Sequence, residues 1–300
     1  MIQAAKKIMM VRPMNFGFDH ASAESNAFQL KEGADHVKEI SRLAIEEFDS
    51  AVAKLRDHGL DVLVIEDTDQ PEKPNAVFPN NWISFHEKQV LLYPMMAENR
   101  RWERRDAVLD TVLNGSEKQI IDLTEFENEA KYLESTGSVV IDYENDLAYA
   151  CLSARTNQEV LQNMCEVLNL EPILFEACDK NGLEIYHTNV MMCLAAEYAV
   201  ICLESIKPEY REVVVAALLK TGHKIVELSM DQIYQFAGNM METINGNGNS
   251  VLVMSETALR SLTLNQKQEL SDFSQILALD IPTIEKYGGG SARCMMCRVE

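Results

Sequence analysis

The sequence predicts a mixed α/β fold made of five similar modules arranged around a common axis. Pairs of short apolar runs recur along the 300 residues, and each pair is typical of a β-hairpin because a polar turn separates its runs. A stretch with helical i, i+3, i+4 spacing then follows the hairpin, and a further apolar run follows that stretch. The modules start near residues 82, 138, 190 and 250, and residues 291–299 close the series. Self-similarity at spacings of 56, 52 and 60 residues indicates a closed or stacked array.

The expected elements follow the same order in each of the first three modules. The hairpins pair 82–84 with 90–93, 138–141 with 147–152, and 190–194 with 199–203. The helices that follow are expected over 102–113, 159–168 and 209–219, and the closing strands over 119–123, 172–175 and 224–228. A long helix over about 34–58 belongs to the module that the C-terminal strand would complete. No linker rich in Pro, Gly or Ser separates the modules, so residues 1–300 are predicted to form a single domain.

Composition excludes two classes of partner. The formal net charge is −20, whereas phosphate contacts need clustered Lys and Arg, so nucleic-acid binding is not expected. The one basic cluster, residues 100–105, is predicted to be a solvated face or a loop on the substrate side. No stretch approaches the roughly 18 apolar residues of a membrane span, so no membrane partner is expected either.

The cysteines indicate a cytoplasmic protein without a metal site. Seven cysteines at irregular spacing do not form a disulfide framework and favour a reducing compartment. The pair Cys294 and Cys297 is not a redox motif, because only three residues follow it and no helix can begin there. It also lacks the second ligand pair that structural zinc needs. We therefore expect no metal and no organic cofactor, while the sequence leaves open whether the chain forms a homo-oligomer.

The C-terminal residues are the strongest functional signal. Three glycines, Gly288 to Gly290, precede Cys294, and glycine lets the backbone approach a ligand closely. Arg293 stands beside the cysteine, and a neighbouring cation lowers a thiol pKa. The apolar run Cys294-Met295-Met296-Cys297 predicts a final buried strand that carries a reactive thiol. The alternative is a buried strand whose cysteines only serve as small hydrophobic side chains.

Polar residues stand at the start of every module, where radial packing would bring them together. They include the carboxylate of Glu134, the imidazole of His187, the thiol of Cys294 and several carboxamides. A nucleophile, a general acid/base and an orienting acid are the parts of a covalent-catalysis site. Of the six histidines, His187 alone enters a strand after a polar turn. The others, His86 and His223 among them, are predicted to lie at the surface.

These motifs resemble the guanidine-modifying enzymes of the pentein, or α/β-propeller, fold. This superfamily includes arginine deiminase, dimethylarginine hydrolase, agmatine deiminase and the amidinotransferases. The resemblance runs over essentially the whole chain and rests on Arg293-Cys294-Met295, on Ser153-Ala154-Arg155-Thr156-Asn157 and on the module start with His187. Three further segments resemble the citrulline-utilisation hydrolase branch: Arg12-Pro13-Met14-Asn15-Phe16-Gly17-Phe18, Phe78-Pro79-Asn80-Asn81-Trp82 and Phe236-Ala237-Gly238-Asn239-Met240.

The resemblance implies a role for each site residue. Cys294 would be the nucleophile, His187 the general acid/base and Glu134 the carboxylate that orients the imidazole. The segment Glu134-Ser135-Thr136-Gly137 departs from the pattern, since it carries one residue more than the usual Glu-Gly-Gly. Arg155 would clamp the substrate α-carboxylate with its guanidinium fork. The substrate-binding set implied by the matching segments is Phe78, Asn80, Asn81, Arg155, Asn189 and Asn239.

Two departures from the superfamily pattern concern the substrate head group. Relatives that process arginine carry aspartates at the positions of Asn81 and Asn189, and those carboxylates pair with a guanidinium. A carboxamide offers both a donor and an acceptor but no charge, which suits a neutral ureido group such as that of citrulline. In the alternative, both asparagines only cap loops and another acid holds a guanidinium.

The resulting functional prediction is a cysteine-dependent hydrolase that cleaves a C–N bond of a ureido or guanidino amino acid. The favoured reaction converts citrulline to ornithine through an intermediate linked to the sulfur of Cys294. The alternatives are an arginine deiminase, an amidinotransferase that passes the one-carbon unit to an amine, and a non-catalytic propeller that binds a ligand.

Overall fold

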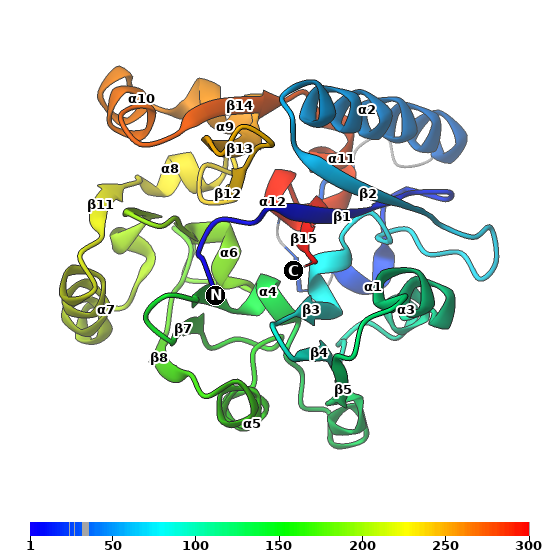
Figure 1. Cartoon of the computed structure of the whole chain (residues 1–300), viewed down its shortest axis with the longest axis horizontal. Helices are drawn as coiled ribbons and strands as arrows, with labels where there is room; N and C mark the ends of the chain where they lie inside the picture. The colour runs from blue at the N-terminus through cyan, green and yellow to red at the C-terminus, as the bar shows by residue number, and fades with distance from the viewer. Residues whose placement is uncertain (24, 27, 32–35, 300) are drawn as a thin grey trace.

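The computed structural model describes residues 1–23, 25–26, 28–31 and 36–299. These residues form five three-stranded sheets around a common centre, and the longer helices lie at the periphery (Figure 1). The predicted α/β fold of five hairpin-plus-helix modules is therefore confirmed.

Every sheet has the same topology, with an antiparallel pair of strands and a third strand parallel to the middle one. In chain order the strands of the first four sheets are β3 (Ile83–Phe85), β4 (Gln89–Leu92) and β5 (Gln119–Asp122); β6 (Val140–Asp142), β7 (Leu147–Cys151) and β8 (Glu171–Phe175); β9 (Met192–Leu194), β10 (Tyr198–Ile201) and β11 (Lys224–Glu227); and β12 (Met241–Ile244), β13 (Ser250–Ser255) and β14 (Gln275–Leu279). The fifth sheet consists of β15 (Cys297–Arg298), β1 (Lys7–Arg12) and β2 (Asp61–Glu66).

Helices provide the crossovers that parallel strands require. Those between the second and third strands of the modules include α2 (Val37–Asp57), α3 (Asp106–Leu113), α5 (Gln158–Leu168), α7 (Pro208–Lys220), α9 (Glu256–Ser261) and α10 (Leu264–Ser271). The start of α5 has a clear local cause, because the side chain of Asn157 accepts hydrogen bonds from the first N–H groups of the helix. Its end lies at Asn169, which adopts the left-handed conformation that terminates helices.

The remaining helical elements are short. They are α1 (His20–Ala23), α4 (Ser135–Ser138), α6 (Thr188–Met191), α8 (Met230–Ile233), α11 (Pro282–Gly288) and α12 (Ala292–Met295), with the 3₁₀ turns η1 (Pro79–Asn81), η2 (Glu98–Glu103), η3 (Thr124–Glu129) and η4 (Leu203–Ser205). Four of them, η1, α4, α6 and α12, lie immediately before the first strand of a module. These inner turns are the elements that carry the site described below.

The first three modules agree with the sequence prediction to within a few residues, with one exception. Residues 98–103 form the 3₁₀ turn η2 and not the start of the predicted helix 102–113, which begins at Asp106. The fourth module starts at Met241 and not near residue 250, which is the second strand of its hairpin. Glu242 interrupts the apolar pattern of β12, and its buried carboxylate accepts hydrogen bonds from Ala196 N and Ser250 Oγ.

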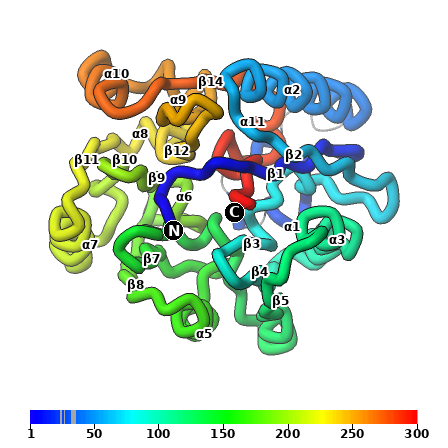
Figure 2. The backbone as a smooth tube through the Cα atoms, viewed as in Figure 1, coloured from blue at the N-terminus to red at the C-terminus, as the bar shows by residue number. Residues whose placement is uncertain are grey.

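The two ends of the chain meet in the fifth module. Strand β15 pairs antiparallel with β1, and β1 pairs parallel with β2, so that both ends of the chain contribute to one sheet (Figure 2). The long helix of this module was predicted over 34–58; α2 covers 37–57, and residues 34 and 35 lie outside the described residues. Its buried side chains include Ile40, Ala44, Phe48 and Leu55, at the spacing of one helix face.

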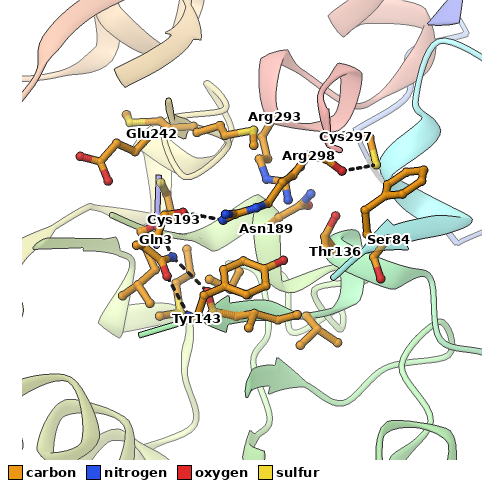
Figure 3. A pocket seen from close by; sticks show the side chains of 18 residues that line it. Gln3, Ser84, Thr136, Tyr143, Asn189, Cys193, Glu242, Arg293, Cys297 and Arg298 are labelled. Carbon is orange, nitrogen blue, oxygen red and sulfur yellow. Dashed lines mark hydrogen bonds between the residues drawn. The ribbon is translucent and has the colours of Figure 1, made fainter. Parts of the chain in front are cut away.

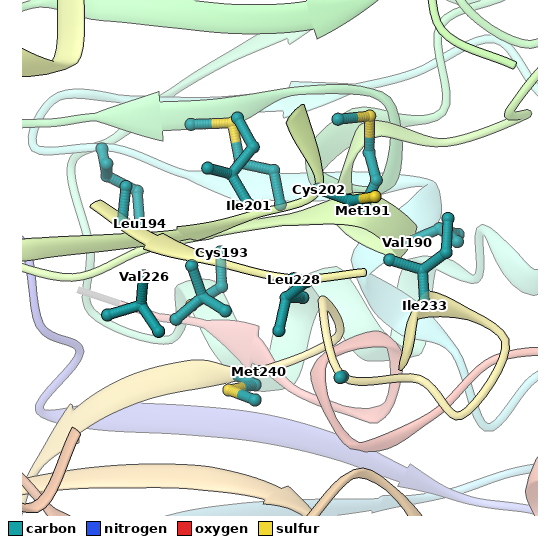
Figure 4. Packing of buried hydrophobic residues seen from close by; sticks show 14 of the residues in the cluster. Val190, Met191, Cys193, Leu194, Ile201, Cys202, Val226, Leu228, Ile233 and Met240 are labelled. Atoms are coloured by element: carbon teal, nitrogen blue, oxygen red, sulfur yellow. The ribbon is translucent and has the colours of Figure 1, made fainter. Parts of the chain in front are cut away.

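The buried apolar side chains of the described residues form four clusters, each with members from more than one strand or helix. The cluster around the third sheet includes side chains of β9, β10 and β11 and extends to Ile233 and Met240 (Figure 4). Strands β9 and β10 are buried at every position, because helices or neighbouring modules cover both faces of the sheet. His86 and His223 are also buried, which corrects their predicted surface position. Within the described part of the chain, no helix is long and apolar enough to cross a membrane.

Candidate active site

The four inner turns bring together side chains that are far apart in the sequence. Asn81 ends η1, Glu134 precedes α4, His187 precedes α6 and Cys294 lies within α12. The turns also contact one another directly, since Thr136 Oγ1 of α4 donates to the carbonyl of Asn80, at 3.2 Å. The geometry of the site is therefore set by the packing of modules against each other.

Cys294 lies on a helical turn and not on the final strand, which corrects the sequence prediction. The strand β15 begins only at Cys297, three residues later. Cys294 is 4% exposed, and the side-chain N–H groups of Asn239 and Asn189 point to its sulfur at 3.3 and 3.6 Å. The side-chain oxygen Oδ1 of Asn239 accepts hydrogen bonds from the backbone N–H of Arg293 and Cys294. Asn239 thus holds the turn and the thiol in one position.

Cys297 and Arg293 face away from this site. Burial raises the pKa of Cys297 to about 12, and its sulfur contacts the carbonyl of Ile83. Arg293 and Cys297 both line a central cavity that the first strands of the modules enclose (Figure 3). Asn189 also lines this central cavity while it contacts Cys294 on its other side. The donors nearest to the Cys294 sulfur are therefore carboxamides, and the guanidinium of Arg293 donates elsewhere, to the carbonyl of Met296.

His187 and Glu134 form a buried hydrogen-bonded pair. The Nε2 atom of His187 lies 2.9 Å from Glu134 Oε2. Burial alone would raise the pKa of Glu134, but Arg155, His187 and Arg100 together hold it well below its usual range. Burial lowers the pKa of His187 to about 4, although Glu134 acts in the opposite direction. Near neutral pH the pair is thus a carboxylate and a neutral imidazole, with Nε2 donating to Glu134 and Nδ1 available as an acceptor.

Ser135 and Gly137, next to Glu134, fit tightly into this arrangement. Ser135 has φ +44°, a left-handed conformation that is uncommon for residues other than glycine. A Cβ atom at Gly137 would lie 2.4 Å from Asn81 Nδ2 and 2.8 Å from the ring of His187. The position of Gly137 therefore requires the absence of a side chain, and the longer Glu134-Ser135-Thr136-Gly137 segment still brings its glycine to the site.

The side chain of Arg155 contacts the carboxylate of Glu134. Its Nη1 atom lies 3.3 Å from Glu134 Oε2, while Nε and Nη2 donate to Ser25 Oγ, and Nη2 also to the carbonyl of Ser22. The guanidinium lies over the ring of Tyr186 at 5.0 Å from its centroid. In this structure Arg155 therefore holds Glu134 in its charged form; the α-carboxylate clamp that the resemblance implies stays a prediction.

A small cavity connects these groups. Its lining includes the predicted residues Phe78, Asn81, Arg155, His187 and Cys294, and also Asn26, Asn75, Arg100, Tyr186 and Gly288 to Gly290. Three of the predicted substrate-binding residues are not in this lining: Asn239 and Asn189 contact the sulfur of Cys294 through their side-chain N–H groups, and Asn80 is buried next to Asn81. The ring of Phe78 packs against Gly288 and Gly290, where any Cβ would come within about 3 Å of it.

Asn81 and Asn189, the two asparagines predicted to bind the substrate head group, both have unsatisfied buried atoms. Asn81 Nδ2 and Asn189 Oδ1 are buried and have no hydrogen-bond partner among the described residues. Buried polar atoms without partners are rare and need an explanation, for which a bound ligand is one candidate. Asn81 lines the same small cavity as Cys294, whereas Asn189 lines the central cavity and reaches Cys294 through its Nδ2.

Arg100 is the main residue that the sequence analysis missed. It belongs to the basic cluster 100–105, yet it is 3% exposed and lines the cavity. Its guanidinium donates to both oxygens of Glu103, at 2.8 and 2.9 Å, and to Asn81 Oδ1, at 2.8 Å. The cluster therefore is not simply a solvated face. The spacing of Arg100 and Glu103 could have suggested an ion pair, but nothing in the sequence indicated Asn81 as a third partner.

The five modules and the convergence of their inner turns define the class: this is a guanidine-modifying enzyme fold of the pentein superfamily. More specifically, residues 12–300 match the family described as N,N dimethylarginine dimethylhydrolase, eukaryotic, and the chain belongs to that family. A sequence comparison with curated proteins found no significant match.

Solved structures with low sequence identity share this fold. The N-terminal domain of ArgZ, an arginine dihydrolase from Cyanobacteria, superposes with a TM-score of 0.76 at 17% identity, covering 98% of this chain and 97% of that chain. AgrE gives a TM-score of 0.77 at 17% identity, covering 98% of this chain and 39% of the longer AgrE chain. A dimethylarginine hydrolase (DDAH) from Pseudomonas aeruginosa, in complex with citrulline, gives 0.67 at 17% identity, covering 98% and 99%.

Proposed function

We propose that this protein hydrolyses a C–N bond of a ureido or guanidino amino acid, with citrulline as the preferred substrate and ornithine as the product. The observation that carries the choice of citrulline is the pair of carboxamides beside Cys294. Asn81 Nδ2 and Asn189 Oδ1 are buried without partners, as a donor and an acceptor. A ureido group offers a carbonyl acceptor and an NH₂ donor, which complement these two atoms.

The reaction proceeds by covalent catalysis. The thiol proton of Cys294 passes to the neutral imidazole of His187, and the thiolate attacks the trigonal carbon of the substrate. With citrulline, His187 then returns the proton to the δ-amine as the C–N bond breaks, which releases ornithine and leaves a carbamoyl group on the sulfur. His187 next takes a proton from water, and the hydroxyl attacks this thioester. The products are carbamate, which decays to ammonia and carbon dioxide, and the regenerated thiol.

Glu134 and Arg155 support the proton transfers. The Glu134 carboxylate stabilises the imidazolium that forms when His187 accepts the proton, because it lies 2.9 Å from Nε2. Arg155 keeps this carboxylate ionised and lines the same cavity, from which it would also hold the α-carboxylate of the substrate. Binding of a small amino acid needs no further partner. We retain a cytoplasmic location, with the seven free cysteines as its support.

A guanidino substrate is the second candidate. The family is described by its action on dimethylarginine, and ArgZ is an arginine dihydrolase. The same thiol and imidazole would attack a guanidinium carbon, and an amidinotransferase would pass the one-carbon unit to an amine. Product analysis with and without an added amine separates hydrolysis from transfer, and a protein without turnover would be a binding propeller.

The decisive test compares substrates directly. Purified protein is supplied with citrulline, arginine, agmatine and methylated arginines, and the release of ornithine and ammonia is followed. We expect a higher kcat/KM for citrulline than for arginine near neutral pH. Faster turnover of arginine would refute the argument from the two carboxamides and would favour a deiminase.

A double variant tests the same argument from the opposite side. Asn81→Asp together with Asn189→Asp should shift the preference toward arginine, because a buried carboxylate attracts the cation and disfavours a neutral head group. Asn247→Asp, in the exposed turn between β12 and β13, adds a carboxylate outside the cavity lining and serves as the control. An unchanged preference in the double variant would remove both asparagines from head-group recognition.

A further inference from the structure

We infer that Arg100 determines the head-group specificity of this site by fixing the orientation of the Asn81 carboxamide. This inference rests on the function proposed above and deepens it. The carboxamides of asparagine can present either oxygen or nitrogen to a ligand, and the two choices select opposite partners. What decides between them here is the hydrogen bond that the Asn81 side chain accepts from Arg100, which lines the same cavity.

The hydrogen bond from Arg100 determines which atom of Asn81 is free. A guanidinium can only donate, so the atom 2.8 Å from Arg100 Nη1 must be the carbonyl oxygen of the amide. The NH₂ group of Asn81 then points away from Arg100. It is buried without a partner and lies beside Gly137, in the space that a Cβ atom would fill. The site therefore presents a donor at this point and cannot present an acceptor without losing the Arg100 bond.

Arg100 is itself held firmly. It is buried, both Glu103 oxygens accept from it, and its Nη2 also donates to the carbonyl of Phe78 at 3.2 Å. Burial opposes its charge, but the adjacent Glu103 carboxylate outweighs burial and keeps the pKa of Arg100 above its usual range. Burial raises the pKa of Glu103 against the opposing effect of Arg100, so we assign the effect of Arg100 on the substrate to the direction of its hydrogen bonds and not to a net charge.

The consequence for substrates follows from their donors and acceptors. A ureido carbonyl accepts a hydrogen bond from the Asn81 NH₂ group. A guanidinium has donors only, so it would face this NH₂ group donor to donor, and both would stay unsatisfied in a buried site. Leaving a buried donor without a partner costs binding by roughly ten-fold or more. Arg100 thus acts as a positioning residue that makes Asn81 select a ureido carbonyl.

The experiment measures binding separately from turnover. Dissociation constants of citrulline and arginine are measured by calorimetry in the Cys294→Ser protein, which removes the nucleophile. The test variant adds Arg100→Met and Glu103→Met together, so that no unpaired charge is left in the core. We expect the ratio of the arginine constant to the citrulline constant to fall by roughly ten-fold, because the freed amide can turn its oxygen toward a guanidinium. Circular dichroism and thermal unfolding verify the fold.

Two comparisons make the result specific. Replacing the neighbouring pair Arg104 and Glu127, which lies outside the cavity lining, with methionines should leave the ratio unchanged. In an Asn81→Asp background the Arg100 and Glu103 replacements should also have little effect on the ratio, since a carboxylate presents an acceptor in either orientation.

The outcomes separate the two hypotheses. If both compounds bind and the ratio does not change in the test variant, or changes equally in the Asn81→Asp background, the role of Arg100 is refuted while the proposed function stands. If the Cys294→Ser protein binds neither compound, the proposed function is wrong and this inference fails with it.

Discussion

Acidification should destabilise this protein through the buried imidazole of His187. Burial lowers the pKa of His187 to about 4 from 6.5, even with Glu134 hydrogen-bonded to the ring. Between these two values the unfolded chain binds a proton at this position and the folded chain does not. The contribution to stability is therefore complete above pH 6.5 and is lost progressively as the pH falls toward about 4. One pKa unit corresponds to about 1.4 kcal/mol, so the loss from pH 7 to pH 5 is about 2 kcal/mol.

The assay compares urea unfolding of the natural protein and of His187→Gln at about pH 7, 6 and 5. The difference between the two proteins isolates His187, which matters because other buried groups titrate in the same range. The carboxyls of Glu47, Glu103 and Glu285 have raised pKa values, mainly from burial, and add a slope of the opposite sign to both proteins.

His86 supplies a matched control for this measurement. Burial lowers the pKa of His86 to about 3. The free energy of unfolding of His86→Gln should therefore depend less steeply on pH than that of the natural protein, because the contribution of His86 is removed. His86 lies outside the cavity lining, and its replacement should leave turnover largely intact. If the natural protein and His187→Gln lose stability in parallel on acidification, His187 is not a buried neutral imidazole and the proton transfers proposed for it lose their basis.

Two further predictions concern the catalytic groups. Cys294→Ser should abolish turnover and keep the fold, whereas Cys297→Ser should retain most activity. Iodoacetamide should label Cys294 first, and bound substrate should protect Cys294 from labelling. Preferential labelling of Cys297 would show that Cys294 is not the nucleophile. His187→Ala should lower kcat by about 10²–10⁴-fold with a smaller effect on substrate binding, as is typical for the loss of positioned proton transfer. A kcat close to that of the natural protein would exclude His187 from the mechanism.

The repeat was accessible from the sequence because each hairpin and helix forms from local patterns. Alternating apolar runs and helical spacing depend on neighbours within a few residues, so the first three modules were predicted with small boundary errors. The fourth module was misplaced because Glu242 lies in the middle of β12, and only its contacts with Ala196 and Ser250 allow a carboxylate to be buried there. Cys294 was assigned to a strand because the apolar run to Cys297 is continuous, while the turn within it depends on Asn239.

The candidate site also has features that the sequence predicts and features that only the tertiary structure decides. The sequence by itself determined which chemical groups stand at the module starts: a thiol, an imidazole, a carboxylate and several carboxamides. It could not determine their directions, because these depend on side chains from other modules. Arg100 is a charged residue in a charged cluster, and its burial beside Glu103 and Asn81 follows only from the packing of η2 against η1. Whether Asn81 presents a donor or an acceptor to the cavity was decided by that packing, because a guanidinium can hydrogen-bond to only one of the two amide atoms.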